Sequence, residues 1–219
     1  MKILAINGSP RKTHNTAELL RHALEGAAAQ GAHQGETVHL YDLNFKGCVS
    51  CFACKLKDGK SYGKCGYRDE LSPVLDKAFE ADALVLGSPI YFEAVTGEMR
   101  SFMERLMFSV LVYNESYGSL LEKKIHTGFI YTMNVPEKLM HELQYPQALK
   151  FGENDMARLL GSCESLFVND TLQFDDYSKY VVTVFDENAK KKVREEQFPR
   201  DCESAFQLGA RLIQKASHK

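Results

Sequence analysis

The sequence has no surplus of basic residues and no long apolar run. Lysine and arginine number 27 against 29 aspartates and glutamates, so the formal net charge is −2. A dedicated nucleic-acid-binding protein normally carries a basic surplus, so we expect no nucleic-acid partner. The longest apolar stretches have the length of strands and are interrupted by charges, so the sequence predicts no membrane-spanning segment.

The sequence also lacks linkers, internal repeats and low-complexity segments. Apolar residues make up 44% of the chain and charged residues 26%, which argues against disorder and fibrous repeats. We therefore predict a single globular domain over residues 1–219, which is long enough to bury a sizeable core without disulfide bonds.

No apolar signal segment precedes the strand-like run at residues 2–6, so we expect a cytoplasmic protein. Thiols stay reduced in the cytoplasm. Six cysteines are present nevertheless, and four of them lie between Cys48 and Cys65. A tight cysteine group in that compartment indicates metal binding or redox chemistry more often than disulfide bonding.

Short apolar runs alternate with amphipathic stretches along most of the chain. This pattern predicts an α/β fold, in which helices cover both faces of a parallel sheet through right-handed crossovers. Five strands in this length fit the flavodoxin-like order as well as half of a Rossmann domain. The predicted strands are at 2–7, 37–41, 83–87, 127–132 and 165–169, and the predicted helices at 16–30, 72–80, 96–111, 146–160 and 201–215.

Three stretches depart from this alternation and are interpreted as insertions, at 48–68, 113–123 and 173–200. The last of them could contain an extra strand at 180–185. It also contains a basic run at 190–192, which we interpret as a solvent-exposed face because two glutamates follow almost at once.

The loop after the first strand, residues 7–16, has the sequence Asn-Gly-Ser-Pro-Arg-Lys-Thr-His-Asn-Thr. It lies at the carboxyl edge of the predicted sheet, where the N–H groups of a starting helix favour an anion. A Walker loop would need Gly-Lys-Ser/Thr, and a dinucleotide loop would need three spaced glycines instead of Gly8 alone. A loop rich in hydroxyls and amides suits a terminal phosphate monoester, such as that of flavin mononucleotide (FMN). The alternative is an ordinary turn in which Asn15 or Thr16 caps the helix.

A second loop, residues 87–92, follows another buried strand and reads Gly-Ser-Pro-Ile-Tyr-Phe. Pro89 stiffens this turn, while Tyr91 and Phe92 offer a flat apolar surface on which a planar ring could bind. The alternative is that both aromatic side chains fill the core beneath the loop. Thr96 is placed to cap the helix that follows.

Together these motifs resemble the NADPH-dependent FMN reductase family of the flavodoxin-like superfamily. Residues 8–12 with 15–16 are similar to its phosphate loop, and residues 88–92 with 96–97 and 99–105 to its flavin-ring loop and helix. The cysteine group narrows the resemblance to the iron–sulfur flavoproteins and their cluster-free relatives. The resemblance implies a flavodoxin-like three-layer sandwich with a five-stranded parallel sheet in the order 2-1-3-4-5.

The resemblance also implies which residues hold FMN. The phosphate would be bound by Ser9, Arg11, Asn15 and Thr16. The isoalloxazine ring would be lined by Pro89, Ile90, Tyr91 and Phe92. A third loop after the fourth strand would contribute Thr132 and Asn134.

The implied activity is the NAD(P)H-dependent reduction of a quinone, a nitro or azo compound, or free flavin, in a homodimer or higher homo-oligomer. No side chain need act as a catalytic acid or base, because the flavin carries the chemistry. One alternative is an electron carrier in which an iron–sulfur cluster connects FMN to a protein partner. A weaker alternative is a phosphate-binding regulatory domain with no redox role.

The cysteines Cys48, Cys51 and Cys54 form C-x₂-C-x₂-C, and Cys65 follows after ten residues. Four such thiolates could bind a [4Fe–4S] cluster, whereas structural zinc more often uses two separated C-x₂-C pairs. The spacer at 55–64 is longer than in the iron–sulfur flavoprotein pattern, so free or redox-active thiols remain an equal alternative.

The remaining cysteines, the histidines and three aromatic residues give weaker indications of function. Buried, inert thiols in helices or turns are expected for Cys163 and Cys202. The seven histidines show no spacing typical of metal ligands. Phe108, Tyr113 and Tyr117 could cover a flavin of a partner subunit, although we expect them to pack in the core.

Overall fold

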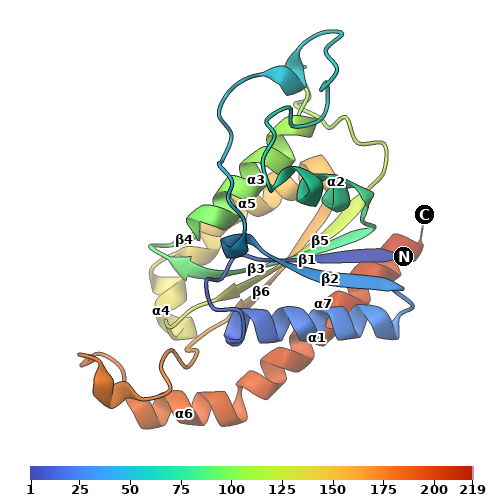
Figure 1. Ribbon diagram of the computed structural model, residues 1–219. Coiled ribbons are helices and arrows are strands. Elements are labelled where there is room, and N and C mark those ends of the chain that lie inside the picture. The colour runs from blue at the N-terminus through green and yellow to red at the C-terminus, as the bar shows by residue number, and fades with distance from the viewer. Residues whose placement is uncertain (219) are drawn as a thin grey trace.

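Five parallel strands form the centre of the computed structural model, which describes residues 1–218 (Figure 1). Their order is β2-β1-β3-β5-β6, so the predicted flavodoxin-like order 2-1-3-4-5 of the parallel strands is confirmed. The strands are β1 (Lys2–Asn7), β2 (Gln34–His39), β3 (Ala83–Tyr91), β5 (Ile125–Thr132) and β6 (Gly161–Val168).

Helices cover both faces of this sheet, because successive side chains of each strand point to opposite sides. In β1, Leu4 and Ile6 belong to the core on one face, while Ile3 and Ala5 belong to the core on the other. The first face carries α2 (Ser72–Glu80), α3 (Gly97–Val110) and α5 (Tyr145–Leu160), and the second carries α1 (Asn15–Ala29) and α7 (Phe198–Ser217) (Figure 1). No helix among residues 1–218 has the length and apolar character needed to cross a membrane.

A sixth strand, β4 (Ala94–Val95), was not predicted, and it pairs antiparallel with the end of β3. The pairing extends β3 to Tyr91, so most of the expected loop at 87–92 is strand. Phe92 and Glu93 form the two-residue turn with positive φ angles of 50° and 61°. Such turns usually contain Asn-Gly or Asp-Gly, and a Phe-Glu pair therefore gives no hairpin signal in the sequence.

The C-terminal third departs most from the sequence prediction. Residues 180–185 contain no strand. Two unpredicted helices are present, α4 (Glu137–Glu142) and α6 (Glu187–Glu196). Short 3₁₀ helices occur at Leu40–Asp42, Ala53–Lys55 and Tyr177–Lys179. The cysteine-rich stretch between the first of these and α2 extends past the end of α3, at the top of Figure 1.

Helices α1 and α7 meet backbone to backbone. A Cβ atom added at Gly26 would lie 1.8 Å from the carbonyl oxygen of Phe206, and one added at Gly209 would lie 1.8 Å from that of Ala23. Glycine is therefore required at both positions, and the two helices are fixed relative to one another.

Candidate functional site

A hollow of about 190 Å³ opens at the carboxyl edge of the sheet, where β1, β3 and β5 end. Three chain segments that are distant in the sequence supply the residues predicted for FMN. The hollow is lined by Ser9, Arg11, Asn15, Thr16, Pro89, Ile90, Tyr91, Thr132 and Asn134, and also by His14, Met133, Thr171, Leu172 and Gln173.

Of the residues predicted for FMN, Phe92 lies outside this lining. It stands at the tip of the β3–β4 turn with 98% of its surface exposed, and Tyr91 beside it is 50% exposed. The alternative that these aromatic side chains fill the core is therefore wrong. The turn presents Phe92 to solvent in a left-handed conformation, which is costly for a non-glycine residue and recurs at functional sites.

The first loop is held by its own side chains. Asn7 Oδ1 accepts a hydrogen bond from the Ser9 amide at 2.9 Å, and Ser9 Oγ accepts one from the Arg11 amide at 3.1 Å. Thr96 Oγ1 donates to the Gly8 carbonyl at 2.7 Å, so the start of α3 is tied to this loop. These bonds fix the path of the loop before any ligand binds.

Helix α1 begins inside the hollow without a side-chain cap. Its N-cap is His14, which makes no capping hydrogen bond, and Asn15 and Thr16 lie within the helix. The alternative in which Asn15 or Thr16 caps α1 is therefore wrong. An uncapped helix start that faces a hollow offers free N–H groups and a positive dipole end to an anion.

The far wall of the hollow comes from the chain after β6. Arg11 Nη1 donates to the Gln173 carbonyl at 2.5 Å, and Asn15 Nδ2 donates to the Leu172 carbonyl at 2.9 Å. Asn134 Nδ2 donates to Gln173 Oε1 at 2.8 Å, whereas the buried Asn134 Oδ1 has no partner among residues 1–218. A buried acceptor without a partner costs about 1–3 kcal/mol, which makes Asn134 an unusual residue of this wall.

Lys190 lies buried behind this wall, contrary to the expectation of a solvent-exposed run at 190–192. Its ammonium donates to the Asn134 carbonyl at 2.6 Å and to the Asp170 carboxylate. Burial lowers the pKa of Lys190, and Asp170 opposes that shift. The sequence did not reveal this role because the neighbouring Lys191 is exposed and pairs with Glu187, as a surface lysine does.

Replacing Lys190 with methionine should lower the free energy of unfolding by about 2 kcal/mol, because Asp170 and the Asn134 carbonyl lose their shared donor. Urea denaturation measures this loss. The matched control is Lys191→Met, which removes an exposed pair and should cost less than about 0.5 kcal/mol. Equal losses in the two variants would contradict the anchoring role of Lys190.

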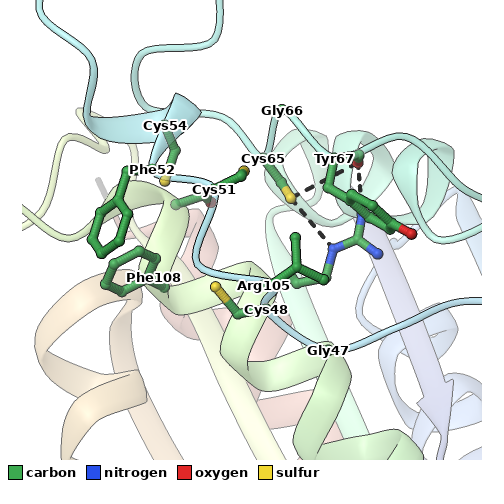
Figure 2. A pocket seen from close by; sticks show the side chains of 12 residues that line it. Gly47, Cys48, Cys51, Phe52, Cys54, Cys65, Gly66, Tyr67, Arg105 and Phe108 are labelled. Carbon is green, nitrogen blue, oxygen red and sulfur yellow. Dashed lines mark hydrogen bonds between the residues drawn. The ribbon is translucent and has the colours of Figure 1, made fainter.

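A second candidate site lies at the C-terminal end of α3 (Figure 2). The hollow predicted for FMN adjoins the N-terminal end of the same helix. One pocket is lined by all four clustered cysteines, together with Phe52, Tyr67, Arg105 and Phe108. All four thiols are free, and Cys48 and Cys51 are exposed. Within residues 1–218, no three of these sulfurs lie within 4.8 Å of one another.

The backbone of this loop is strained on either side of Cys51. Ser50 and Phe52 have positive φ angles of 52° and 55°. Each such non-glycine conformation costs of order 1 kcal/mol or more and persists only where the surroundings require it. These two left-handed residues bend the loop where Cys48, Cys51 and Cys54 line one pocket.

Arg105 is the residue of this site that the sequence analysis missed. It is 1% exposed and donates through Nε to Cys65 Sγ at 3.3 Å (Figure 2). Its other nitrogens bond Asp69 at 2.6 Å, the Tyr67 carbonyl at 2.9 Å and the Lys46 carbonyl at 3.1 Å. This bond fixes the position of the Cys65 sulfur at the edge of the pocket. The sequence could have indicated this role, because Arg105 is a charged residue at helical spacing from Phe102 and Ser109 on the buried face of α3.

The aromatic side chains beside this pocket are exposed rather than packed in the core. Tyr113 and Tyr117 are 61% and 58% exposed, so the expectation of core packing is wrong for both. Phe108 contacts Phe52 and Tyr113 edge to face, with centroids 6.0 and 6.1 Å apart.

The remaining two cysteines lie away from both sites. Cys202 is buried in α7, whereas Cys163 is half-buried in β6 rather than in a helix or turn. Burial raises the pKa of each thiol to about 11, so both are protonated at neutral pH.

Sequence comparisons relate the chain to known proteins. The sequence model of the NADPH-dependent FMN reductase family matches residues 1–134. An iron–sulfur flavoprotein of Archaeoglobus fulgidus is 45% identical over 105 residues, which are 48% of this chain and 48% of that protein. Another from Methanocaldococcus jannaschii is 38% identical over 105 residues, which are 48% of this chain and 51% of that one. The chain thus spans about half the length of the curated relatives it matches.

Solved structures share the fold across nearly the whole chain. An NAD(P)H:quinone oxidoreductase from Methanothermobacter marburgensis aligns with a TM-score of 0.70 at 14% identity, covering 97% of this chain and 96% of that one. An azoreductase from Bacillus anthracis aligns with a TM-score of 0.64 at 16% identity, covering 96% and 99%. At these identities the likeness shows the fold alone.

Proposed function

Because the chain belongs to the NADPH-dependent FMN reductase family, we propose that it binds FMN in the hollow at the carboxyl edge of the sheet. There it uses NAD(P)H to reduce a quinone, a nitro or azo compound, or free flavin. The observation that carries this proposal is the convergence of three separate predicted segments on one hollow at an uncapped helix start.

The residues present fit FMN. Ser9, Arg11, Asn15 and Thr16, with the first N–H groups of α1, would hold the phosphate. Pro89, Ile90 and Tyr91 would line the ring on one side and Thr132 and Asn134 on the other. When bound, FMN accepts hydride and releases electrons singly or in pairs, and the protein orients it and controls access to it.

Replacing Ser9 and Thr16 together with alanine should raise the Kd for FMN by roughly 30-fold, because two hydrogen bonds of about 1 kcal/mol each are lost. Quenching of flavin fluorescence on titration with apoprotein measures Kd. Thr13→Ala is the matched control, since Thr13 belongs to the same loop, is exposed and does not line the hollow. An unchanged Kd in the double variant, with native circular dichroism, would overturn the phosphate site.

The second candidate function is electron transfer between FMN and a protein partner through a [4Fe–4S] cluster. It is favoured by the pocket that gathers Cys48, Cys51, Cys54 and Cys65 beside the buried Arg105. Such a cluster transfers one electron at a time, and Arg105 would hold the sulfur of Cys65 in place through its Nε–H.

The visible spectrum of protein purified without oxygen separates the two functions. Flavin bands with a broad iron–sulfur shoulder support the carrier, and flavin bands alone support the reductase. A colourless protein that takes up no added FMN rejects both.

The homo-oligomer is part of the same proposal. Tyr113 and Tyr117 follow the C-terminal end of α3, whereas the FMN hollow adjoins its N-terminal end, so within one chain they cannot cover their own flavin. They would instead cover the flavin of a second copy. Light scattering of the purified protein tests this, since a monomer at micromolar concentration contradicts it.

A further inference from the structure

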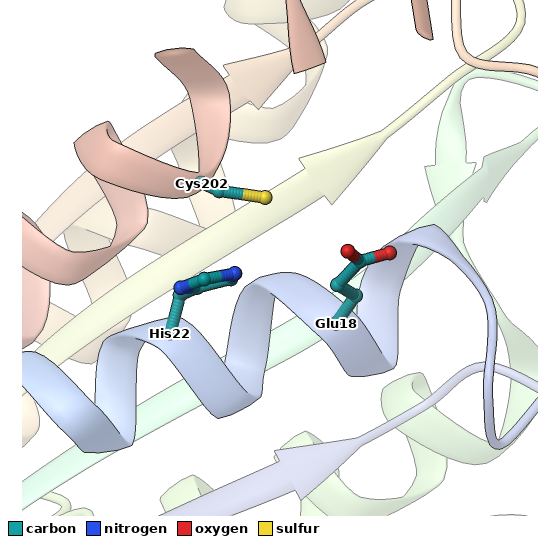
Figure 3. Close-up of side chains that lie close together, drawn as sticks. All are labelled: Glu18, His22 and Cys202. Carbon is teal, nitrogen blue, oxygen red and sulfur yellow. The ribbon is translucent and has the colours of Figure 1, made fainter. Parts of the chain in front are cut away.

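Glu18 and His22 on α1 and Cys202 on α7 point into one space between the two helices (Figure 3). Their ligand atoms all lie within 4.8 Å of one another, and within residues 1–218 no other group of three or more such side chains is this close. Glu18 and His22 are one helical turn apart and so share a face. Cys202 comes from the facing helix, which is why the spacing of the histidines in the sequence gave no metal signal.

The two helices hold these side chains at a fixed separation. The contacts at Gly26 and Gly209 press the α1 and α7 backbones together further along the same interface. The Cys202 side chain is buried, while Glu18 and His22 keep about a quarter of their side-chain surface exposed, at 29% and 26%. Cys202 therefore bounds this space on its buried side, and the partly exposed Glu18 and His22 leave it accessible from solvent.

Neighbouring charges orient two of the three side chains. His22 Nδ1 lies 3.2 Å from Glu25 Oε2, and a proton shared there leaves Nε2 with its lone pair free. Glu18 Oε2 accepts a hydrogen bond from Arg194 Nη2 at 2.6 Å, which fixes the orientation of this carboxylate. Arg21 Nη2 lies 3.0 Å from His22 Nε2, and this exposed side chain must turn away when Nε2 binds an ion.

We propose that Glu18, His22 and Cys202 bind one Zn²⁺ ion, with water as the fourth ligand. A carboxylate, an imidazole and a thiolate are the three ligand types that zinc takes in proteins, whereas Ca²⁺ and Mg²⁺ take oxygen ligands. Binding releases the Cys202 thiol proton to solvent, and the thiolate and the carboxylate, which also pairs with Arg194, offset the charge of the ion. The ion would join the helix that follows the first loop to the C-terminal helix.

The test uses Co²⁺ as a spectroscopic probe in the 219-residue chain carrying serine at positions 48, 51, 54 and 65, which removes the thiols of the cysteine pocket. We expect one equivalent of Co²⁺ to bind with a sulfur-to-cobalt charge-transfer band, and Zn²⁺ to abolish that band by displacement. Adding Cys202→Ala should remove the band. Adding His22→Ala should weaken Co²⁺ binding by about tenfold or more.

His141→Ala is the matched control, because His141 on α4 also lies one turn from a glutamate, Glu137, but is exposed. It should leave Co²⁺ binding unchanged. A band that persists in Cys202→Ala, or equal affinities with and without His22, would overturn the proposal. If the Cys202→Ala variant does not fold, the proposal is tested by His22→Ala alone, because the His22 side chain is partly exposed and its loss should leave the fold intact. FMN binding is measured separately, so failure of the zinc site leaves the proposed function untouched.

Discussion

Replacing Arg105 with methionine lowers the free energy of unfolding by about 3–5 kcal/mol, the usual cost of removing one partner from a buried ion pair. The guanidinium is buried and makes four hydrogen bonds, to one carboxylate, two carbonyls and one sulfur. Methionine fills much of the space but satisfies none of these groups. Asp69, whose side chain is only 12% exposed, is left as an unpaired charge. Urea denaturation at neutral pH measures the loss.

The matched control is Arg100→Met on the same helix. Arg100 is exposed and pairs with Glu104 one turn away, so its loss should cost less than about 0.5 kcal/mol. Where Arg105→Met is too unstable to purify, Arg105→Lys keeps the charge but not the four bonds and should show an intermediate loss. Similar stabilities of the Arg100 and Arg105 variants would show that the buried network contributes little.

Replacing Cys51 with serine removes nearly all iron from protein purified without oxygen, if the cysteine pocket holds the proposed cluster. The unsubstituted protein should then contain about four iron atoms per chain. The proposed cluster uses all four cysteines of the pocket, so no further cysteine lines the pocket to replace Cys51. Iron analysis and the reduction potential report the loss.

Cys163→Ser is the control for this experiment, because Cys163 lies in β6 outside the pocket. It should leave the iron content unchanged. Iron content and reduction potential that are the same in Cys51→Ser and in the unsubstituted protein would reject the cluster, and the four cysteines would then be free or redox-active thiols.

The parallel sheet could be predicted from the sequence because its strands are buried on both faces and appear as unbroken apolar runs. Residues 83–86 and 129–131 are examples. The end of β3 could not be predicted, since it depends on a hairpin whose Phe92-Glu93 turn lacks glycine and asparagine. Helix α6 could not be predicted either. Its sequence has almost no apolar face, and Lys190 and Arg194 attach it through polar contacts.

The candidate sites were predictable to the extent that their residues are close in sequence or follow neighbouring strands. The first loop and the end of β3 meet because parallel strands end at the same edge. Residues that depend on tertiary packing gave no such signal. Thr171, Leu172 and Gln173 reach the hollow from the end of β6, and Cys202 reaches His22 across a helix interface.

The wall that closes the hollow lies outside the region that the family model matches. That region ends at residue 134, whereas Arg11 and Asn15 are held by the carbonyls of Gln173 and Leu172, and Asn15 also by Arg194. The first loop thus lies within the matched region, whereas the residues that hold it lie beyond that region. Two relatives with identical first loops can differ in how firmly that loop is preorganised, and hence in cofactor affinity, through changes confined to the C-terminal third.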